Sequence, residues 1–293
     1  MQNNKTIRVG GVPEHFNLPW HLAKDSTLFK QKGLKISWTD FKGGTGEMTQ
    51  ALRNNLVDIA IVLTEGIVAD IVKGNQAKLI GVYVKSPLQW GIHVANHSAI
   101  YSPEDIKGKT AAISRYGSGS HLMSYVNADN KEWPIHNLKF EVIRNLDGGR
   151  KALKEGTADY FMWEKYTTKP FVDNGEFRRV DVCPTPWPSF MIAVRTEFLE
   201  ENEELIEHLL ETIYQSNYAF INNPDSCMQI SELYNLKFED VKKWYSETEW
   251  AIDEPIDLNM LNMVQERLVS LDIIPNKIDS KSFVWNRCLS EPI

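Results

Sequence analysis

Two segments rich in small residues could bind a ligand through their backbones. The first, Ser118-Gly119-Ser120, follows an expected strand and leads into an expected helix. Small residues let a ligand approach the chain, and the first amides of a helix lack internal partners, so an oxygen or an anionic group can bind there. Capping of the helix by a serine is the alternative role. We expect capping and binding together.

The second segment, Gly43-Gly44-Thr45-Gly46-Glu47, is its counterpart in the first half of the chain. Its three glycines permit backbone conformations that are closed to other residues. No Lys-Ser or Lys-Thr follows them, so the segment is not a Walker phosphate loop and ATP hydrolysis is not expected. Gly44 and Thr45 are candidate ligand contacts, and an ordinary turn before a helix is the alternative.

Aromatic residues gather in expected loops and at expected strand ends. A flat heterocycle gains buried area and stacking energy from such rings, although each ring alone could equally be a core residue. The ligand is therefore expected to contain a ring. The residues are Phe16, Trp90, Tyr116, Trp163, Trp187 and Phe190.

Polar side chains at the same places could orient that ring. Glu65 follows the expected strand 57–63, and Glu164 follows a matching strand at 158–163, so each half offers one carboxylate to a protonated or amino-bearing ring. For Glu65 the alternative is a first-turn glutamate that stabilises its own helix. The polar candidates are Glu14, Thr64, Glu65, Arg115, Asp147 and Glu164.

Catalysis and metal binding have weaker support. His15 lies near the first expected loop and could contact a ligand, but no second histidine, cysteine or carboxylate lies at a recognisable metal spacing. No serine lies in a GxSxG elbow. We therefore assign no catalytic residue, expect neither metal nor cofactor, and favour a binding protein over an enzyme.

Composition limits the partners. The chain has 293 residues, 42% of them hydrophobic, and a net charge of −7. At roughly 150 residues per domain this predicts two domains. No apolar stretch is long enough for membrane insertion, and no basic run suits nucleic acid. A small molecule is the expected partner.

Cysteine usage and the N-terminus indicate a compartment. Cys183, Cys227 and Cys288 are far apart and odd in number, which argues against a disulfide framework. Residues 1–6 lack the order of a signal peptide. We expect a cytoplasmic protein, or a periplasmic or extracellular one if a leader was removed.

An internal repeat organises the chain. Ala51-Leu52-Arg53 followed by Val57-Asp58 matches Ala152-Leu153-Lys154 followed by Ala158-Asp159, 101 residues later. Each copy is expected to form a helix, a turn and a buried strand. A glycine pair, Gly43-Gly44 or Gly148-Gly149, is expected to precede each helix.

The alternation of strand and helix patterns predicts an α/β protein with two lobes, each a mainly parallel sheet flanked by helices. Lobe one is expected over residues 1–92 plus 188–293, with the C-terminal helices on it, and lobe two over 93–187. Ligands of such sheets bind outside the carboxyl ends of the strands. A ligand cleft between the lobes is therefore expected.

The order of several motifs resembles type II periplasmic-binding-like proteins, in the branch that holds sulfonate and nitrate carriers and the thiamine-pyrimidine proteins. The likeness spans residues 6–195, and members without a secretion signal occur in fungi. It implies a hinged binder that closes on its ligand. The motifs are Arg8-Val9-Gly10-Gly11, Gly43-Gly44-Thr45-Gly46-Glu47, Val57-Asp58-Ile59-Ala60, Ile106-Lys107-Gly108-Lys109, Ser118-Gly119-Ser120-His121 and Ala158-Asp159.

The resemblance leaves two alternatives. A thiamine-pyrimidine enzyme would need a catalytic histidine, a pyridoxal-phosphate lysine and a cysteine-rich segment; His15 matches loosely in position, and the chain has no cysteine-rich segment. An extracytoplasmic receptor for sulfonate-like or nitrate-like solutes would have a transporter as its partner only if it is secreted.

Overall fold

The chain divides into two compact units in the computed structural model, which describes residues 5–252 and 255–289. Unit 1 comprises Met1–Ser86, Trp187–Val269 and Ile274–Ile293, and unit 2 comprises Pro87–Pro186 and Ser270–Ile273. The chain therefore passes from unit 1 to unit 2 after residue 86, whereas the sequence patterns predicted this boundary after residue 92. The reason is β5 (Gln89–Ala95), which pairs along its length with strands of unit 2.

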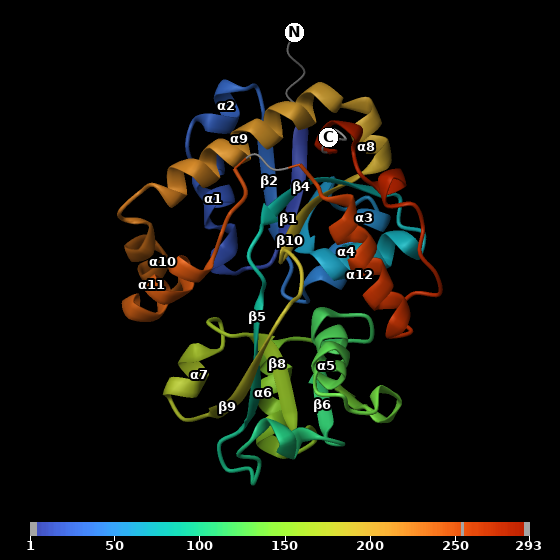
Figure 1. Cartoon of the computed structure of the whole chain (residues 1–293). Helices are drawn as coiled ribbons and strands as arrows, with labels where there is room; N and C mark the ends of the chain where they lie inside the picture. The colour runs from blue at the N-terminus through green and yellow to red at the C-terminus, as the bar shows by residue number, and fades with distance from the viewer. Residues whose placement is uncertain (1–4, 253–254, 290–293) are drawn as a thin grey trace. The chain divides into compact units, whose positions relative to one another are not determined.

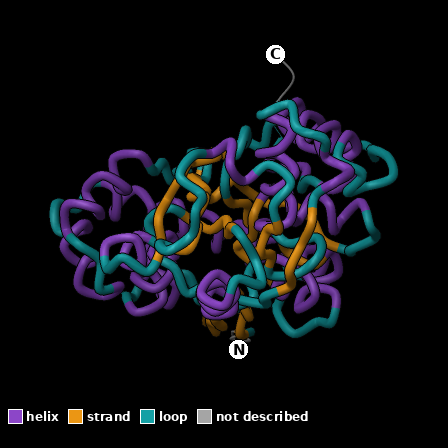
Figure 2. Tube along the Cα trace, turned by 90° about the horizontal axis from the view of Figure 1, so that it is seen from below, coloured by secondary structure: helices purple, strands orange, loops and turns teal. Residues whose placement is uncertain are grey.

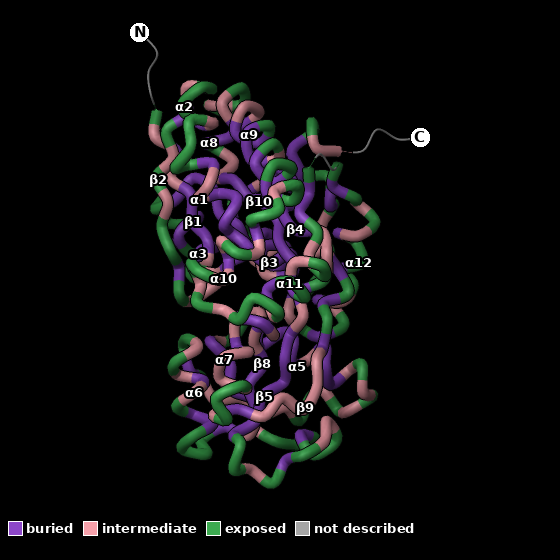
Figure 3. Tube along the Cα trace, turned by 90° about the vertical axis from the view of Figure 1, so that its left-hand side faces the viewer, coloured by how far each residue is buried: buried purple, intermediate pink, exposed green. Residues whose placement is uncertain are grey.

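Unit 1 contains a five-stranded sheet in the order β2-β1-β3-β10-β4. Only β10 runs against the others, so the sheet is mainly parallel. The central strands β3 and β10 are continuous apolar runs, as expected for strands covered on both faces, and they are buried (Figure 3). The strands are β1 (Thr6–Gly11), β2 (Lys35–Asp40), β3 (Ile59–Leu63), β4 (Ala77–Val84) and β10 (Phe190–Arg195).

Helices flank this sheet and include most of the C-terminal third of the chain (Figure 1). The long α9 packs against α1, as its buried apolar stripe requires. The helices are α1 (Leu18–Asp25), α2 (Leu28–Gln31), α3 (Thr45–Arg53), α4 (Thr64–Val72), α8 (Thr196–Glu201), α9 (Glu203–Ile221), α10 (Ser226–Tyr234), α11 (Phe238–Glu247) and α12 (Leu258–Ser270).

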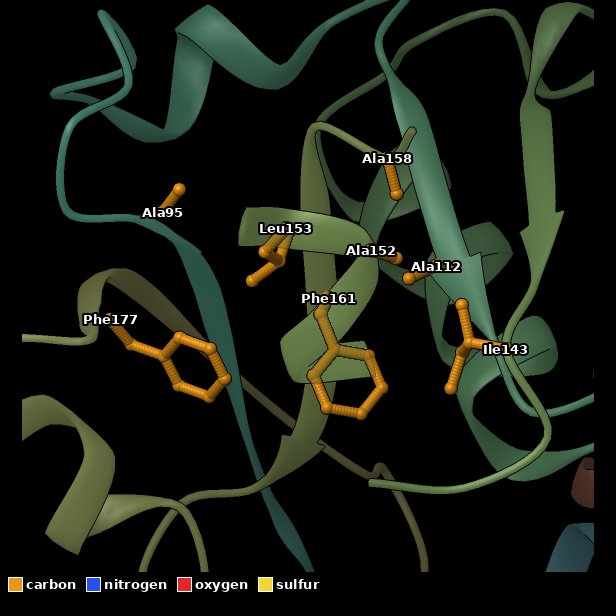
Figure 4. Close-up of a cluster of buried hydrophobic side chains, with 8 residues drawn as sticks. All are labelled: Ala95, Ala112, Ile143, Ala152, Leu153, Ala158, Phe161 and Phe177. Carbon is orange, nitrogen blue, oxygen red and sulfur yellow. The ribbon is translucent and has the colours of Figure 1, made fainter. Parts of the chain in front are cut away.

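Unit 2 repeats the plan with the order β7-β6-β8-β5-β9, in which β5 alone is reversed. Helices pack against the strands of this sheet. Figure 2 colours the strands of the chain orange and the helices purple. Phe161, Phe177 and Leu153 centre a small core between sheet and helix (Figure 4). The other elements are β6 (Thr110–Ile113), α5 (Gly119–Asn130), β7 (Lys139–Val142), α6 (Leu146–Glu155), β8 (Tyr160–Glu164), α7 (Lys169–Asp173) and β9 (Phe177–Pro184).

The structure confirms the repeated helix-turn-strand unit, because α3 and α6, and likewise β3 and β8, begin 101 residues apart. In each unit an aspartate joins two parallel strands in the same way: Asp58 joins β3 to β1, and Asp159 joins β8 to β6. The Asp58 amide donates to the Arg8 carbonyl at 2.8 Å, and the Arg8 amide donates to Asp58 Oδ2 at 2.9 Å. Asp159 and Thr110 exchange the same two bonds.

Two details of the predicted repeat are wrong. Gly148 and Gly149 lie inside α6 rather than before it, because Asn145 caps the helix by accepting the Gly148 amide at 2.9 Å. Gly44, by contrast, is the residue that precedes α3, with φ +71°. At the offset of 101, Glu164 ends β8 and corresponds to Leu63, so it is not the counterpart of Glu65.

Asp58 supports a stability prediction. Burial alone would raise its pKa, but hydrogen bonds and charge from Arg8, with a further bond from Arg195, lower it instead. Asp58→Asn should therefore destabilise unit 1 by about 2 kcal/mol, since both arginines lose a charged acceptor. Urea unfolding measures this. Asp159→Asn is the matched control because Thr110 occupies the position of Arg8, and equal losses in both variants would refute the role of the arginines.

Candidate functional site

The predicted residues of unit 1 meet at one edge of its sheet. Strands β1, β2 and β3 are adjacent and parallel, so their carboxyl ends share that edge. The residues that follow these ends are Glu14, His15 and Phe16 after β1, Gly44 and Thr45 after β2, and Thr64 and Glu65 after β3. Ligands of α/β sheets bind at such an edge.

Hydrogen bonds of two threonine hydroxyl groups stabilise this edge. Thr45 Oγ1 accepts the Leu63 amide at 3.0 Å, which joins the start of α3 to the end of β3. The Thr64 amide donates to the Ser189 carbonyl at 3.1 Å, and its hydroxyl donates to the Pro188 carbonyl. These two threonines therefore have structural roles that hold Glu65 in place.

Glu65 is a fully buried carboxyl group in the first turn of α4. The Trp187 indole Nε1–H donates to its Oε2 at 2.6 Å. Among the described residues, its other oxygen, Oε1, has no hydrogen-bond partner. Burial raises the pKa of Glu65 to about 7, although its own backbone amide and Trp187 act in the opposite direction. The group can therefore change charge near neutral pH.

Aromatic rings line the neighbouring part of the edge. Phe190 begins β10 opposite Leu63, and its ring centroid lies 5.1 Å from that of Phe16. The His15 ring lies edge-on to the Trp244 ring of α11, with 4.1 Å between the ring centroids. Burial lowers the pKa of His15 to about 3, so its ring is neutral. Its Nε2 has no partner within the part of the chain that the structure describes.

At the corresponding edge of unit 2, serines organise the start of α5. Ser118 caps the helix by accepting the His121 amide at 3.4 Å, so the capping role is confirmed. Ser120 Oγ accepts the Ser114 amide at 3.0 Å and lies 3.1 Å from Ser118 Oγ. Gly119 is the first residue of the helix. Ligand binding by this segment stays a prediction.

The loop before α5 presents an exposed ring. Tyr116 is 65% exposed, and its neighbour Arg115 is partly buried. The Gly117 amide donates to His121 Nδ1 at 3.1 Å, and the His121 ring packs against Tyr116 and Phe140. His121 was not among the predicted site residues, although it follows the serine segment directly.

Trp90 and Glu164 face each other across β5 and β8 at this edge. Within the described residues, the buried Trp90 Nε1 has no partner. Glu164 Oε2 accepts the amides of Tyr166 at 2.9 Å and Thr167 at 2.6 Å. Burial raises the pKa of Glu164, while these bonds oppose the rise. Its carboxylate therefore already supports the turn after β8.

Two further candidates have local roles. Trp163 packs on the unit 2 core beside Phe161, at 5.3 Å between centroids. Asp147 is 85% exposed and pairs with Arg150 at 3.1 Å in the first turn of α6. Asp147 lies in α6 and Trp163 packs on the core beside it, so both are near α6 rather than the serine segment. Asp147 also lines a surface groove of about 750 Å³.

The described residues contain no cluster of histidine, cysteine and carboxylate side chains suited to a metal ion. No helix in the described ranges is both long and apolar enough to cross a bilayer. Neither finding identifies a ligand.

The two five-stranded sheets, each with its fourth strand reversed, have the type II periplasmic-binding-protein fold. More particularly, residues 90–183 match the Ca3427-like PBP family, where PBP denotes periplasmic binding protein. No curated protein matches the chain in sequence.

Solved structures with the same fold match 96% of this chain. The CA3427 gene product of Candida albicans is 28% identical, with a TM-score of 0.89 and 96% of each chain covered. The alkanesulfonate-binding protein SsuA of Xanthomonas axonopodis pv. citri, bound to MOPS, is 16% identical, with a TM-score of 0.82 and 96% of this chain and 98% of that chain covered. The nitrate-binding protein NrtA of Synechocystis PCC 6803 is 14% identical, with a TM-score of 0.71 and coverage of 96% and 85%.

Proposed function

We propose that the chain binds a small molecule that contains a ring, at the carboxyl edges of its sheets. The names of structural relatives support binding of small solutes in general, since one binds alkanesulfonates and another nitrate. The fold alone does not determine a ligand, so the proposal depends on the side chains at these edges.

The observation that carries the proposal is a set of buried polar atoms without partners at these edges. Among them are Glu65 Oε1, His15 Nε2 and Trp90 Nε1, each unpaired among the residues described. A buried polar group without a hydrogen bond costs roughly 1–3 kcal/mol, so most such groups have a partner. A bound ligand would supply that partner.

The aromatic residues support a ring-shaped ligand. Phe16 and Phe190 border the unit 1 edge, and Trp90 and Tyr116 border that of unit 2. A planar ligand packs well against such faces. That one molecule contacts both units, and that the units close on it, stays a prediction.

Calorimetric titration of the purified chain tests the proposal. The panel contains cytosine, uracil, adenine, a thiamine-type aminopyrimidine, ethanesulfonate and nitrate. We expect at least one compound to bind, and Trp90→Ala to weaken a ring ligand by about 1–3 kcal/mol through lost stacking and buried area.

Tyr101→Ala is the matched control for Trp90. Tyr101 is an aromatic residue of the same unit, 72% exposed and beyond the far end of β5. It should leave affinity unchanged. Absence of binding by every compound would overturn the proposed function, and equal weakening by both variants would remove Trp90 from the site.

A transport receptor is the second candidate. It is supported by the names of two proteins of similar structure, a periplasmic sulphonate-binding SsuA and a ligand-binding component of an ABC-type import system. We propose a cytoplasmic location instead, because Cys183, Cys227 and Cys288 are all free thiols. Fractionation of cells that express the native gene decides: recovery outside the cytoplasm would favour the receptor.

A further inference from the structure

We propose that Glu65 selects ligands that offer an N–H donor, such as an amino group on a nitrogen heterocycle, over anions and over ligands that offer only an acceptor. The inference deepens the proposed function and depends on it. It rests on how the two oxygens of this carboxyl group are used.

The two oxygens of Glu65 differ in their partners. The indole of Trp187 donates to Oε2 at 2.6 Å, while Oε1 is buried and unpartnered among the described residues. At a pH above the raised pKa of Glu65 its carboxylate is ionised, and an ionised carboxylate only accepts hydrogen bonds. The group that completes Oε1 is therefore a donor, and a ring amino group or a protonated ring nitrogen meets that requirement.

Charge favours the same class of ligand. The groups that oppose the rise in the pKa of Glu65 are its own backbone amide and the Trp187 indole, and both are neutral. The side chain is fully buried, so a nearby charge acts on it through a weakly screening medium. An amino-bearing or cationic ligand is stabilised by the carboxylate there, whereas a sulfonate or nitrate is repelled.

The surroundings of Glu65 suit a flat ring. Trp187, which donates to the carboxyl group, is itself 2% exposed, and Phe190 begins β10 opposite Leu63 at the end of β3. Phe190 stands next to Phe16. We expect a heterocycle bound at this edge to pack its face against such rings, which favours it over an aliphatic amine.

Matched ligands test the inference, because each pair differs by one group. 4-Aminopyrimidine and adenine carry an amino group where 4-methoxypyrimidine and 6-methoxypurine carry a methoxy oxygen, and the ring nitrogens are the same within each pair. Calorimetric titration of the whole chain at pH 8.5 should show the amino member of a pair binding at least about tenfold more tightly than the methoxy member, since the wrong member leaves a buried group unpaired.

Glu65→Gln should reverse this preference. The Trp187 N–H continues to need an acceptor, so the glutamine oxygen stays with it and the amide NH₂ takes the place of Oε1. Two donors then face each other in the amino complex, and its affinity should fall roughly 30-fold or more, while the methoxy ligand gains a partner. Trp187→Phe keeps the carboxylate and should keep the amino preference.

Glu204→Gln is the matched control, since Glu204 is exposed on α9, and it should leave the ratio unchanged. Equal affinities within both pairs, or a ratio unchanged by Glu65→Gln in a variant with the wild-type circular dichroism spectrum, would overturn the inference. Tight binding of ethanesulfonate or nitrate unaffected by that change would overturn it too, yet leave the proposed function standing. No binding by the whole panel would end both.

Discussion

Gly148→Ala should destabilise unit 2 by about 3 kcal/mol or more. A Cβ atom at this position would lie 1.8 Å from the Ile143 carbonyl oxygen, and that oxygen belongs to the backbone. The helix cannot withdraw freely, because Asn145 anchors its first turn and Gly149 lies against the Phe161 ring. Urea unfolding, followed by fluorescence and circular dichroism, measures the loss.

Gly156→Ala provides the control within the same helix. Gly156 ends α6 with φ +71°, and no atom lies within 4 Å of the position of its Cβ. Only the strained backbone conformation costs energy there, about 1 kcal/mol. A Gly148→Ala variant that unfolds at the wild-type urea concentration would show that α6 does not pack on the Ile143 segment as described.

Glu65→Gln should change how the stability of the unliganded protein depends on pH. Burial raises the pKa of Glu65 from its ordinary 4.5 to about 7. Between those values the folded state holds the proton more firmly than the unfolded state does, so stability falls as pH rises. Ionising the buried group costs about 3 kcal/mol across this range, and the variant avoids that cost.

The measurement is the difference in unfolding free energy between wild type and Glu65→Gln as a function of pH. The unfolding free energy of the variant relative to wild type should increase as the pH rises from 4.5 to one unit above the raised pKa, and should then stay constant. Glu204→Gln controls for removal of an ordinary exposed carboxyl group. A difference that stays constant over the range would mean that Glu65 is not buried as described.

Local patterns predicted most of the fold but missed two strands. The apolar run of β3 and its copy β8 show in the sequence because helices cover both faces of these strands. By contrast, β9 contains Arg178, Arg179 and Asp181, and β5 is interrupted by Gly91 and His93. β5 and β9 are strands because they pair with each other, and β5 also with β8, although these segments lie far apart in the sequence. A local sequence pattern does not contain that information.

The candidate site was predictable to the same extent. Residues after parallel strands share an edge by topology, so Thr45, Glu65 and Ser118 could be selected from the sequence. The bond from Trp187 to Glu65 spans 122 residues, and Trp244 reaches His15 from α11. Such partners depend on tertiary packing, and therefore only the structure identifies them.

The most direct test of ligand binding at this edge is the indole N–H resonance of Trp187 in protein labelled with ¹⁵N-tryptophan, assigned by its loss in Trp187→Phe. Titration with cytosine or adenine should move this resonance progressively to saturation, because the ligand occupies the other oxygen of the carboxyl group that Trp187 holds. A Trp187 resonance that does not move while calorimetry shows the ligand fully bound would contradict the account.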